Sequence, residues 1–186
     1  MSTSAEVVLR DGRVAVLRAV PYEDPVARDL VARVQQEYVV RYGGPDGAVV
    51  DPAEFRPPAG LFLVAEVDGV PAGCGAWRVH GPGVVEIKRL YVEPAFRQLG
   101  LAQAVVVELE RSATAAGHRS VVLNSGDRQP EALALYAALG YFPVSGYGLY
   151  AGRAGAVFLG KALPGSAPSA EGTATTEDSE ERPWAS

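Results

Sequence analysis

The segment from Val84 to Gly117 constrains the fold most, because it passes from a strand-like run into a helix through one glycine turn. Its first part, "VVEIKRLYV", is apolar and rich in β-branched residues, which is typical of a strand. Its last part begins after Gly100 and reaches Gly117, the residue type expected just past a helix C-terminus. The spacing predicts a helix over residues 101–116 whose N-terminal N–H groups favour an anion, although an ordinary surface turn explains the pattern equally well.

Apolar runs elsewhere predict a mixed α/β domain without internal repeats around this unit. Every fourth residue from Val26 to Tyr38 is hydrophobic, which indicates an amphipathic helix over residues 25–41. Glycine and proline interrupt residues 42–60, which are expected to form a loop with one short helix at "DPAEF". The other expected elements are strands at residues 13–18, 61–67, 72–79, 84–92, 120–124, 141–144 and 156–163, and a helix at residues 130–139.

The composition fits one globular domain followed by a polar tail. Hydrophobic residues make up 48% of the 186 residues, which is enough to bury a core. The net charge is −5, but residues 164–186 hold five acidic residues and one arginine, so residues 1–163 are close to neutral. Near-neutrality argues against a broad nucleic-acid-binding surface. We therefore predict a single domain over residues 1–163 and a disordered acidic tail over residues 164–186.

Neither a targeting segment nor a metal site is expected. The chain begins without a basic segment followed by an apolar core, and no run approaches the roughly 20 apolar residues that span a bilayer. A cytoplasmic protein without a membrane partner is therefore predicted. The single cysteine, Cys74, excludes an internal disulfide and is expected to be a buried thiol. His80 and His118 are expected in exposed turns and are too few for a metal cluster, so no metal is predicted.

Two stretches, "EIKRLYVEPAFRQLGLAQAV" and "RQPEALALYAALGYFPV", together point to one family. The first resembles motif A of the GNAT superfamily, the acyl-CoA-dependent N-acetyltransferases, with the R/Q-x-x-G-x-G/A loop at residues 97–102. The second resembles motif B of the same superfamily, in the expected order and spacing, and the resemblance covers about residues 7–163. It implies a mixed, mostly antiparallel central sheet with a splayed parallel strand pair and flanking helices.

The resemblance implies where acetyl-CoA, the co-substrate, would bind. In this family the strand before the turn bulges away from its neighbour, so that its amides face the pantetheine arm. The backbone amides of the loop would hold the pyrophosphate, with added charge from an arginine. The Gln at position 129 departs from the common Asn, which is a better helix N-cap. The implied cofactor-binding residues are Leu90, Tyr91, Val92, Arg97, Gln98, Leu99, Gly100, Leu101, Ala102, Gln129 and Tyr136.

The resemblance implies three catalytic residues, Tyr136, Glu86 and Leu90. The Leu90 N–H would polarise the thioester carbonyl, and the Tyr136 phenol would protonate the CoA thiolate. Glu86 stands where some members carry a glutamate base that receives the amine proton. Two alternatives stay open: Tyr136 as an aromatic residue of the core, and Lys88 as a simple counter-ion of Glu86.

The predicted activity is acetyl transfer to a primary amine of a small molecule, by direct attack in a ternary complex. The loop of residues 42–60 and the segment "SGYGLYAGRAG" are expected to recognise the acceptor. Asn124 is neutral where relatives often carry a carboxylate, which argues against a polyamine. Protein or peptide N-acetylation, a non-catalytic acyl-CoA-binding regulatory module and a homodimer are left open. The candidate substrate contacts are Tyr38, Tyr42, Asn124, Tyr147 and Tyr150.

Overall fold

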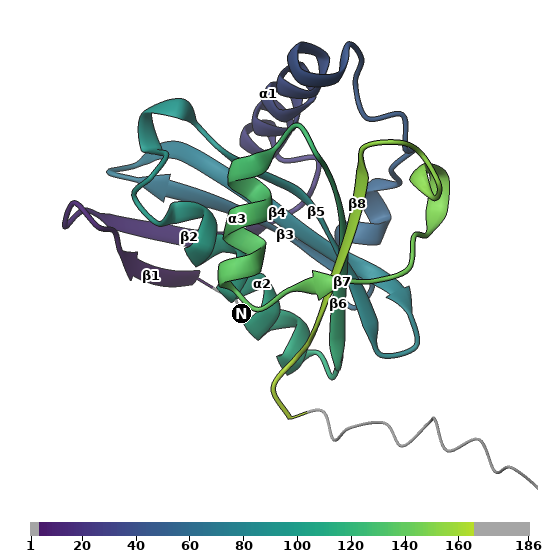
Figure 1. The fold of residues 1–186 in the computed structure, drawn as a ribbon. Helices are drawn as coiled ribbons and strands as arrows, with labels where there is room; N and C mark the ends of the chain where they lie inside the picture. Colours follow the sequence, from purple (N-terminus) through teal and green to yellow (C-terminus); the bar gives the residue numbers. More distant parts are fainter. Residues whose placement is uncertain (1–3, 166–186) are drawn as a thin grey trace, which may run out of the picture.

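The computed structural model describes residues 4–165, which fold around one eight-stranded sheet (Figure 1). Neighbouring strands are antiparallel, except for one parallel pair, β5 and β6. The predicted mixed, mostly antiparallel sheet with one parallel strand pair is thereby confirmed. In the order in which they lie in the sheet, the strands are β1 (Ser4–Val8), β2 (Val14–Val20), β3 (Gly60–Val67), β4 (Val70–Gly81), β5 (Val84–Val92), β6 (Ser120–Gly126), β8 (Ala156–Ala162) and β7 (Phe142–Pro143).

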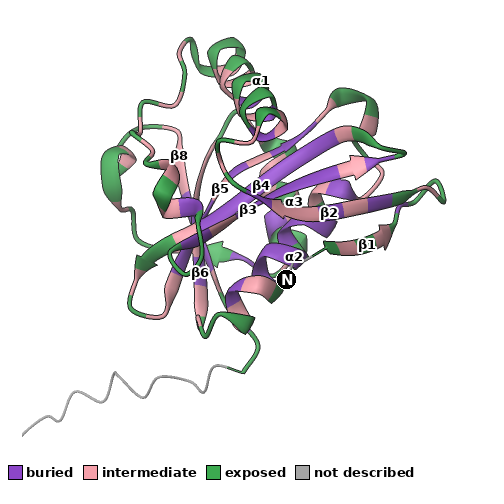
Figure 2. Ribbon diagram, turned by 180° about the vertical axis from the view of Figure 1, so that it is seen from behind, coloured by how far each residue is buried: buried purple, intermediate pink, exposed green. Residues whose placement is uncertain are grey.

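Helices cover both faces of the sheet, and Figure 1 shows α1 and α2 on opposite sides of it. On one face, α1 buries Leu30 and Val34 in a core cluster that also contains Phe55 and strand residues of β3 and β4. On the other face, α2 and α3 contribute to a larger cluster. Figure 2 shows that β3 and β4 are buried along most of their length, whereas the edge strand β1 is not. The helices are α1 (Pro25–Tyr42), η1 (Pro52–Phe55), η2 (Pro94–Phe96), α2 (Leu101–Ala115), α3 (Pro130–Ala138) and η3 (Gly148–Tyr150), where η denotes a 3₁₀ helix.

The sequence-based boundaries agree closely with these elements, and each expected strand or helix ends within two residues of the observed one. The strand β1 was not among the expected strands, although its apolar residues precede Asp11-Gly12, a dipeptide favoured in hairpin turns; none of its residues is buried. The expectation that His80 lies in a turn was wrong, since this exposed residue belongs to β4. The acidic tail predicted for residues 164–186 lies outside the described residues from position 166 onward. Within residues 4–165, no helix has the length and apolarity needed to cross a membrane.

The parallel pair β5–β6 is short, and this shortness creates the space in which a ligand can bind. The two strands pair over four positions, from Val84 opposite Ser120 to Ile87 opposite Leu123. Beyond Ile87, β5 continues beside β4, and β6 continues beside β8. The carboxyl ends of the two parallel strands therefore separate, as the resemblance implied.

A β-bulge in β5 lies at the point of separation. Lys88 pairs with Ala76 and Tyr91 pairs with Cys74, so two residues of β5, at positions 89 and 90, face the single residue Gly75 of β4. A Cβ on Gly75 would approach a side chain of α2 to 2.7 Å, which explains glycine at this position. Within the bulge, residue 89 has a φ of 59°, a left-handed conformation that is uncommon outside glycine.

Candidate active site

A cavity of about 560 Å³ opens where β5 and β6 separate. This volume is in the range of about 300–1,000 Å³ that is usual for small-molecule sites. Four of the five predicted substrate contacts line it, whereas Tyr147 lines a second cavity of about 110 Å³. The two cavities share Lys88, Asn124, Leu149 and Tyr150. The walls of the larger cavity are Tyr38, Tyr42, residues 44–47, 87–89 and 124–126, Gln129, Leu149, Tyr150 and residues 153–156.

The turn before α2 has a backbone that can present N–H groups to an anion. Gly100 is the N-cap residue of α2 with a φ of 89°, and Gln98 also has a left-handed φ of 64°. The space beside Gly100 is open, because a Cβ there would meet only the side chain of Arg10, at 3.8 Å. Gly100 has no side chain to cap the helix, so the first N–H groups of α2 stay available to a ligand. The turn therefore fits a phosphate group.

Arg97 lies beside this turn but is held by other groups. Its Nε donates to the Val92 carbonyl at 2.9 Å, and its Nη2 donates to Glu37 of α1 at 2.7 Å. The guanidinium also lies over the ring of Tyr91, 5.8 Å from the centroid. Arg97 therefore connects the turn to β5 and α1. Its positive charge is partly neutralised by the Glu37 carboxylate.

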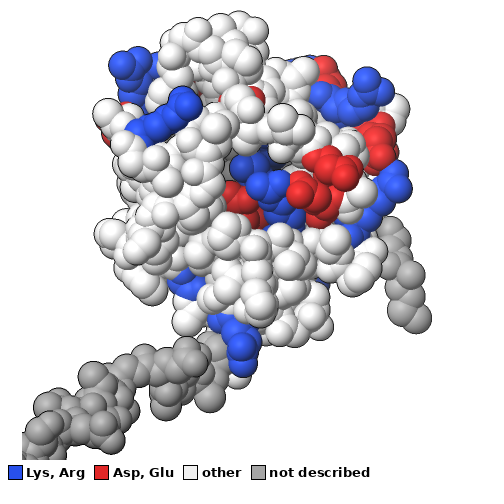
Figure 3. Space-filling view, turned by 90° about the vertical axis from the view of Figure 1, so that its right-hand side faces the viewer, with Lys and Arg blue, Asp and Glu red and all other residues white. Residues whose placement is uncertain are grey.

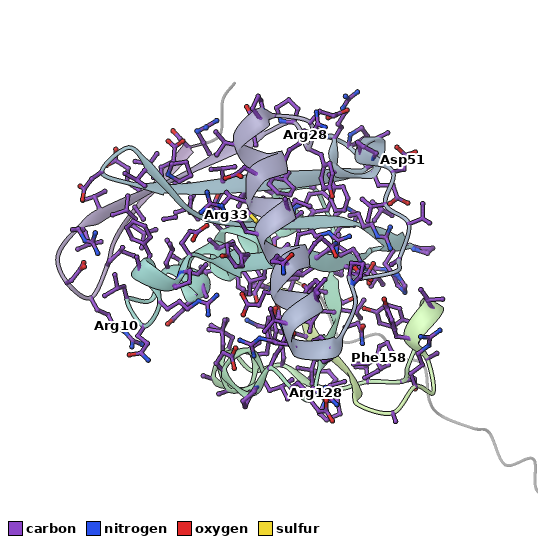
Figure 4. All side chains as sticks on the ribbon, turned by 90° about the horizontal axis from the view of Figure 1, so that it is seen from above. Arg10, Arg28, Arg33, Asp51, Arg128 and Phe158 are labelled. Atoms are coloured by element: carbon purple, nitrogen blue, oxygen red, sulfur yellow. The ribbon has the colours of Figure 1, made fainter. Side chains whose placement is uncertain are left out.

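Arg10 is a second basic residue at the turn, which the sequence did not single out. Its N–H donates to the Leu99 carbonyl at 3.0 Å, and its guanidinium donates to the Gln98 carbonyl at 3.4 Å. Figure 4 shows Arg10 at the connection between β1 and β2. Because 88 positions separate Arg10 from Gln98, no local sequence pattern links the two residues.

Glu86 is buried and paired with two cations. Its side chain is 5% exposed, the Arg78 Nε donates to it at 2.9 Å, and the Lys88 Nζ lies 3.5 Å away. The counter-ion interpretation of Lys88 therefore fits the geometry, and Arg78 adds a second counter-ion. Figure 3 shows, on the side of the molecule that lies to the right in Figure 1, a hollow in which basic and acidic side chains meet. The role of Glu86 as a base stays a prediction.

Two phenols are candidates for the general acid: Tyr38 lines the larger cavity, whereas Tyr136 is close to Tyr38 but lines neither of the two cavities. Tyr136 of α3 is 5% exposed, and its ring centroid lies 5.3 Å from that of Tyr141, so the ring belongs to the core. Burial and the neighbouring Tyr38 raise the pKa of the Tyr136 phenol. Burial also raises the pKa of Tyr38, which lines the cavity, to about 12. Both phenols are therefore protonated at neutral pH, as a general acid must be.

The bulge residue Arg89 holds the loop over the cavity through Asp46. The Arg89 Nη1 donates to the Asp46 carboxylate at 2.6 Å, and the two side chains are 4% and 13% exposed. Tyr150 donates to the same carboxylate at 2.7 Å and accepts from the Gly47 N–H at 2.9 Å. Burial alone would raise the pKa of Asp46, but bonds from Ala48 N–H, Tyr150 and Arg89 hold it below its usual value. The sequence identified neither Asp46 nor Arg89.

The carboxyl end of β6 forms the opposite wall. The Asn124 Nδ2 lies 3.3 Å from the Val157 carbonyl, so its amide group faces β8 as well as the cavity. Gln129 is the N-cap residue of α3 but makes no capping bond, in agreement with the weak cap expected from glutamine. The Tyr42 hydroxyl packs directly on Gly126, where an added Cβ would lie 2.0 Å from it. Tyr42 thereby reaches from α1 across to β6.

Raising the pH above about 10 is expected to destabilise the protein, because buried tyrosines resist ionisation in the folded state. Burial raises the pKa values of Tyr38, Tyr136, Tyr141 and Tyr147. Their contribution to stability is complete below the unfolded-state pKa of about 10 and is lost as pH rises through the folded-state values. Urea denaturation at several pH values, followed beside phenolate absorbance, measures the effect. Stability that stays constant while all the phenols titrate near pH 10 would contradict it.

Comparisons with known proteins agree with this geometry. Residues 28–141 match the model of the Acetyltransferase (GNAT) family. An uncharacterized N-acetyltransferase of Schizosaccharomyces pombe is 36% identical over 117 residues, which cover 57% of this chain and 71% of that protein. The IAA acetyltransferase of Azospirillum brasilense is 28% identical over 151 residues, which cover 81% and 98% of the two chains. A GNAT family acetyltransferase of Elizabethkingia anophelis with acetyl-CoA bound has a similar fold, with a TM-score of 0.59, 15% identity and coverage of 80% and 98%.

Proposed function

We propose that this chain, which belongs to the acetyltransferase (GNAT) family and is an acetyl-CoA-dependent N-acetyltransferase, acetylates a primary amine of a small molecule. The observation that carries the choice of acceptor is the cavity of about 560 Å³ at the separation of β5 and β6. Two loops that line it are bonded to each other, because the Gly47 N–H donates to the Tyr150 hydroxyl at 2.9 Å. An extended peptide requires an open groove, whereas this loop contact favours a compact acceptor.

Residues of this chain would supply the groups that acetyl-CoA requires. The turn from Gln98 to Ala102 would hold the pyrophosphate through backbone N–H groups, with Arg10 and Arg97 as the neighbouring cations. Leu90 lies in the bulge, Tyr91 and Val92 follow it, and these residues would direct amides toward the pantetheine arm and the thioester. The Leu90 N–H would stabilise the negative charge that develops on the carbonyl oxygen during attack by the amine.

Two side chains would manage the protons of the reaction. Glu86 would receive a proton from the attacking amine through a water molecule, because its carboxylate lies in the small cavity that adjoins the larger one. Tyr136 would donate its phenolic proton to the departing thiolate. Cys74 has no covalent role in this scheme, since it is fully buried, donates to the Arg89 carbonyl at 3.3 Å, and has a pKa that burial raises.

The proposed function is tested by calorimetry with acetyl-CoA, followed by a free-thiol assay over small amines, amino acids and short peptides. The expected result is saturable acetyl-CoA binding and thiol release that depends on a small primary amine. Initial rates should show a sequential pattern, because both substrates are bound before transfer. Release with peptides alone would move the acceptor class to proteins, and a ping-pong pattern would contradict direct attack.

Replacing Arg10 by alanine is expected to weaken acetyl-CoA binding about tenfold, because a cation beside the phosphate-binding turn is lost. Arg13→Ala is the matched control on the same hairpin, since Arg13 is paired with Asp11 at 2.8 Å and its guanidinium lies over Phe96. Calorimetry at two salt concentrations measures the effect, which should shrink at high salt. Equal losses in the two variants would show that Arg10 acts only through the net charge of the hairpin.

A further inference from the structure

The charges around the larger cavity are unfavourable for an amine that carries no other charge. Three cationic side chains, those of Lys88, Arg89 and Arg153, line the cavity beside one carboxylate, that of Asp46. A simple alkyl amine is mostly an ammonium ion at neutral pH, because its pKa is close to the value of about 10.4 that is usual for a lysine side chain. Lys88 and Arg89 are paired with Glu86 and Asp46, so Arg153 leaves an excess positive charge that opposes the entry of such an ion.

Asp46 cannot serve as the anion that attracts the ammonium group. One of its oxygens accepts from Arg89 at 2.6 Å, and the other accepts from Tyr150 at 2.7 Å and from the Ala48 N–H at 3.0 Å. In the adjoining cavity, the carboxylate of Glu86 is paired with two cations. Both carboxylates near the site are therefore already neutralised by the chain itself.

Arg153 is the cation at the cavity whose charge is not matched by a carboxylate among residues 4–165. Its side chain is exposed, and its guanidinium lies over the ring of Tyr150, 5.5 Å from the centroid. Tyr150 is itself fixed by its bonds to Asp46 and Gly47. Stacking on a fixed ring orients the planar guanidinium and leaves its N–H groups available to a ligand.

We propose that the acceptor is a primary amine that also carries an anionic group, a carboxylate or a phosphate, and that Arg153 binds this group. The inference rests on the proposed function, because it names the acceptor class of the same cavity. A guanidinium matches either anion through paired hydrogen bonds. The neutral side chain of Asn124 on the opposite wall fits the same conclusion. It offers no negative charge to the second ammonium group that a diamine acceptor would carry.

The test is a free-thiol assay with paired acceptors, one of which carries the anion and one of which does not. Each amino acid is compared with its carboxamide, and phosphoethanolamine is compared with ethanolamine, so that the two arms separate carboxylate from phosphate. If the acceptor carries a carboxylate, the KM of the amino acid should be about tenfold lower than that of its carboxamide. If it carries a phosphate, the KM of phosphoethanolamine should be about tenfold lower than that of ethanolamine. Equal KM values within every pair would overturn the inference and leave the proposed function intact. Absence of thiol release with every acceptor would overturn both.

Variants of Arg153 assign the effect to this residue. Arg153→Ala should raise the KM of the anionic acceptor about tenfold, and it should leave the KM of the carboxamide and the Kd of acetyl-CoA unchanged. Arg153→Lys should restore part of the loss, because the charge is kept while the paired geometry is not. Arg28→Ala, a change at an exposed arginine of α1 outside the cavity, is the control. Weaker acetyl-CoA binding in Arg153→Ala with an unchanged acceptor KM would assign Arg153 to the cofactor and overturn the inference.

Discussion

Tyr136→Phe is expected to lower kcat about 10²-fold, with little change in the Kd of acetyl-CoA. The hydroxyl is the only group removed, and the ring keeps its place in the core, 5.3 Å from the ring of Tyr141. Without a proton donor the thiolate must leave as an anion, which raises the barrier of the transfer step. Steady-state kinetics with the best amine give kcat, and calorimetry gives the Kd.

Tyr38→Phe is the matched control for this experiment. Tyr38 lines the cavity and interacts electrostatically with Tyr136. If Tyr136 is the acid, Tyr38→Phe should change KM more than kcat, because the lost hydroxyl belongs to the acceptor wall. The reverse outcome, a large loss of kcat in Tyr38→Phe alone, would transfer the acid role to Tyr38. Acyl thioesters of more acidic thiols depend less on protonation of the leaving group. With these thioesters, the loss of kcat should become smaller only in the variant that lacks the true acid.

Arg89→Ala is expected to destabilise the fold by about 3–5 kcal/mol, because it leaves a buried carboxylate without its cation. The side chains of Arg89 and Asp46 are 4% and 13% exposed, so water can replace the lost partner only in part. The measurement is the free energy of unfolding from urea denaturation at pH 7. Arg28→Ala, at an exposed position of α1, should change that free energy by no more than about 0.5 kcal/mol.

A double-mutant cycle separates the ion pair from other effects at position 89. Asp46→Ala combined with Arg89→Ala should cost less than the sum of the two single changes, because the double variant buries no unpaired charge. Arg89→Asn tests the backbone separately, since asparagine tolerates the left-handed φ of 59° better than alanine does. Additive single and double losses would contradict the role given to the Asp46–Arg89 pair.

Much of the fold was predictable, because glycine and proline mark the ends of its elements. The turn at Asp68-Gly69 separates β3 from β4, Gly117 follows α2, and Pro130 begins α3. The strand β1 could not be predicted in the same way. None of its five residues is fully buried, and Val7 packs only partly against the core, so that this short strand carries little of the apolar signal of a core strand.

The candidate site was predictable where it is local in the sequence. The bulge after Lys88 and the left-handed turn at Gly100 each depend on a few neighbouring residues, and a motif can represent them. Asp46 lies in a glycine-rich loop and resembles an ordinary turn residue until tertiary structure brings it to Arg89, 43 positions away. Arg153 acquires its role in the same way, through the ring of Tyr150 and the cavity beside it.

Only four residue pairs join β5 to β6, so the sheet consists of two parts, one of five strands and one of three, with a short connection between them. On the far side of the gap, Arg41 of α1 and Arg128 of the β6–α3 connection each donate to the other's carbonyl, at 2.8 and 2.9 Å. Figure 4 shows Arg128 at the end of α1. We therefore expect these bonds to restrain the angle between the two parts of the sheet at the open end of the gap. The width of the cavity, and with it the size of acceptor that fits, then depends on this link between α1 and the β6–α3 connection as well as on the wall residues.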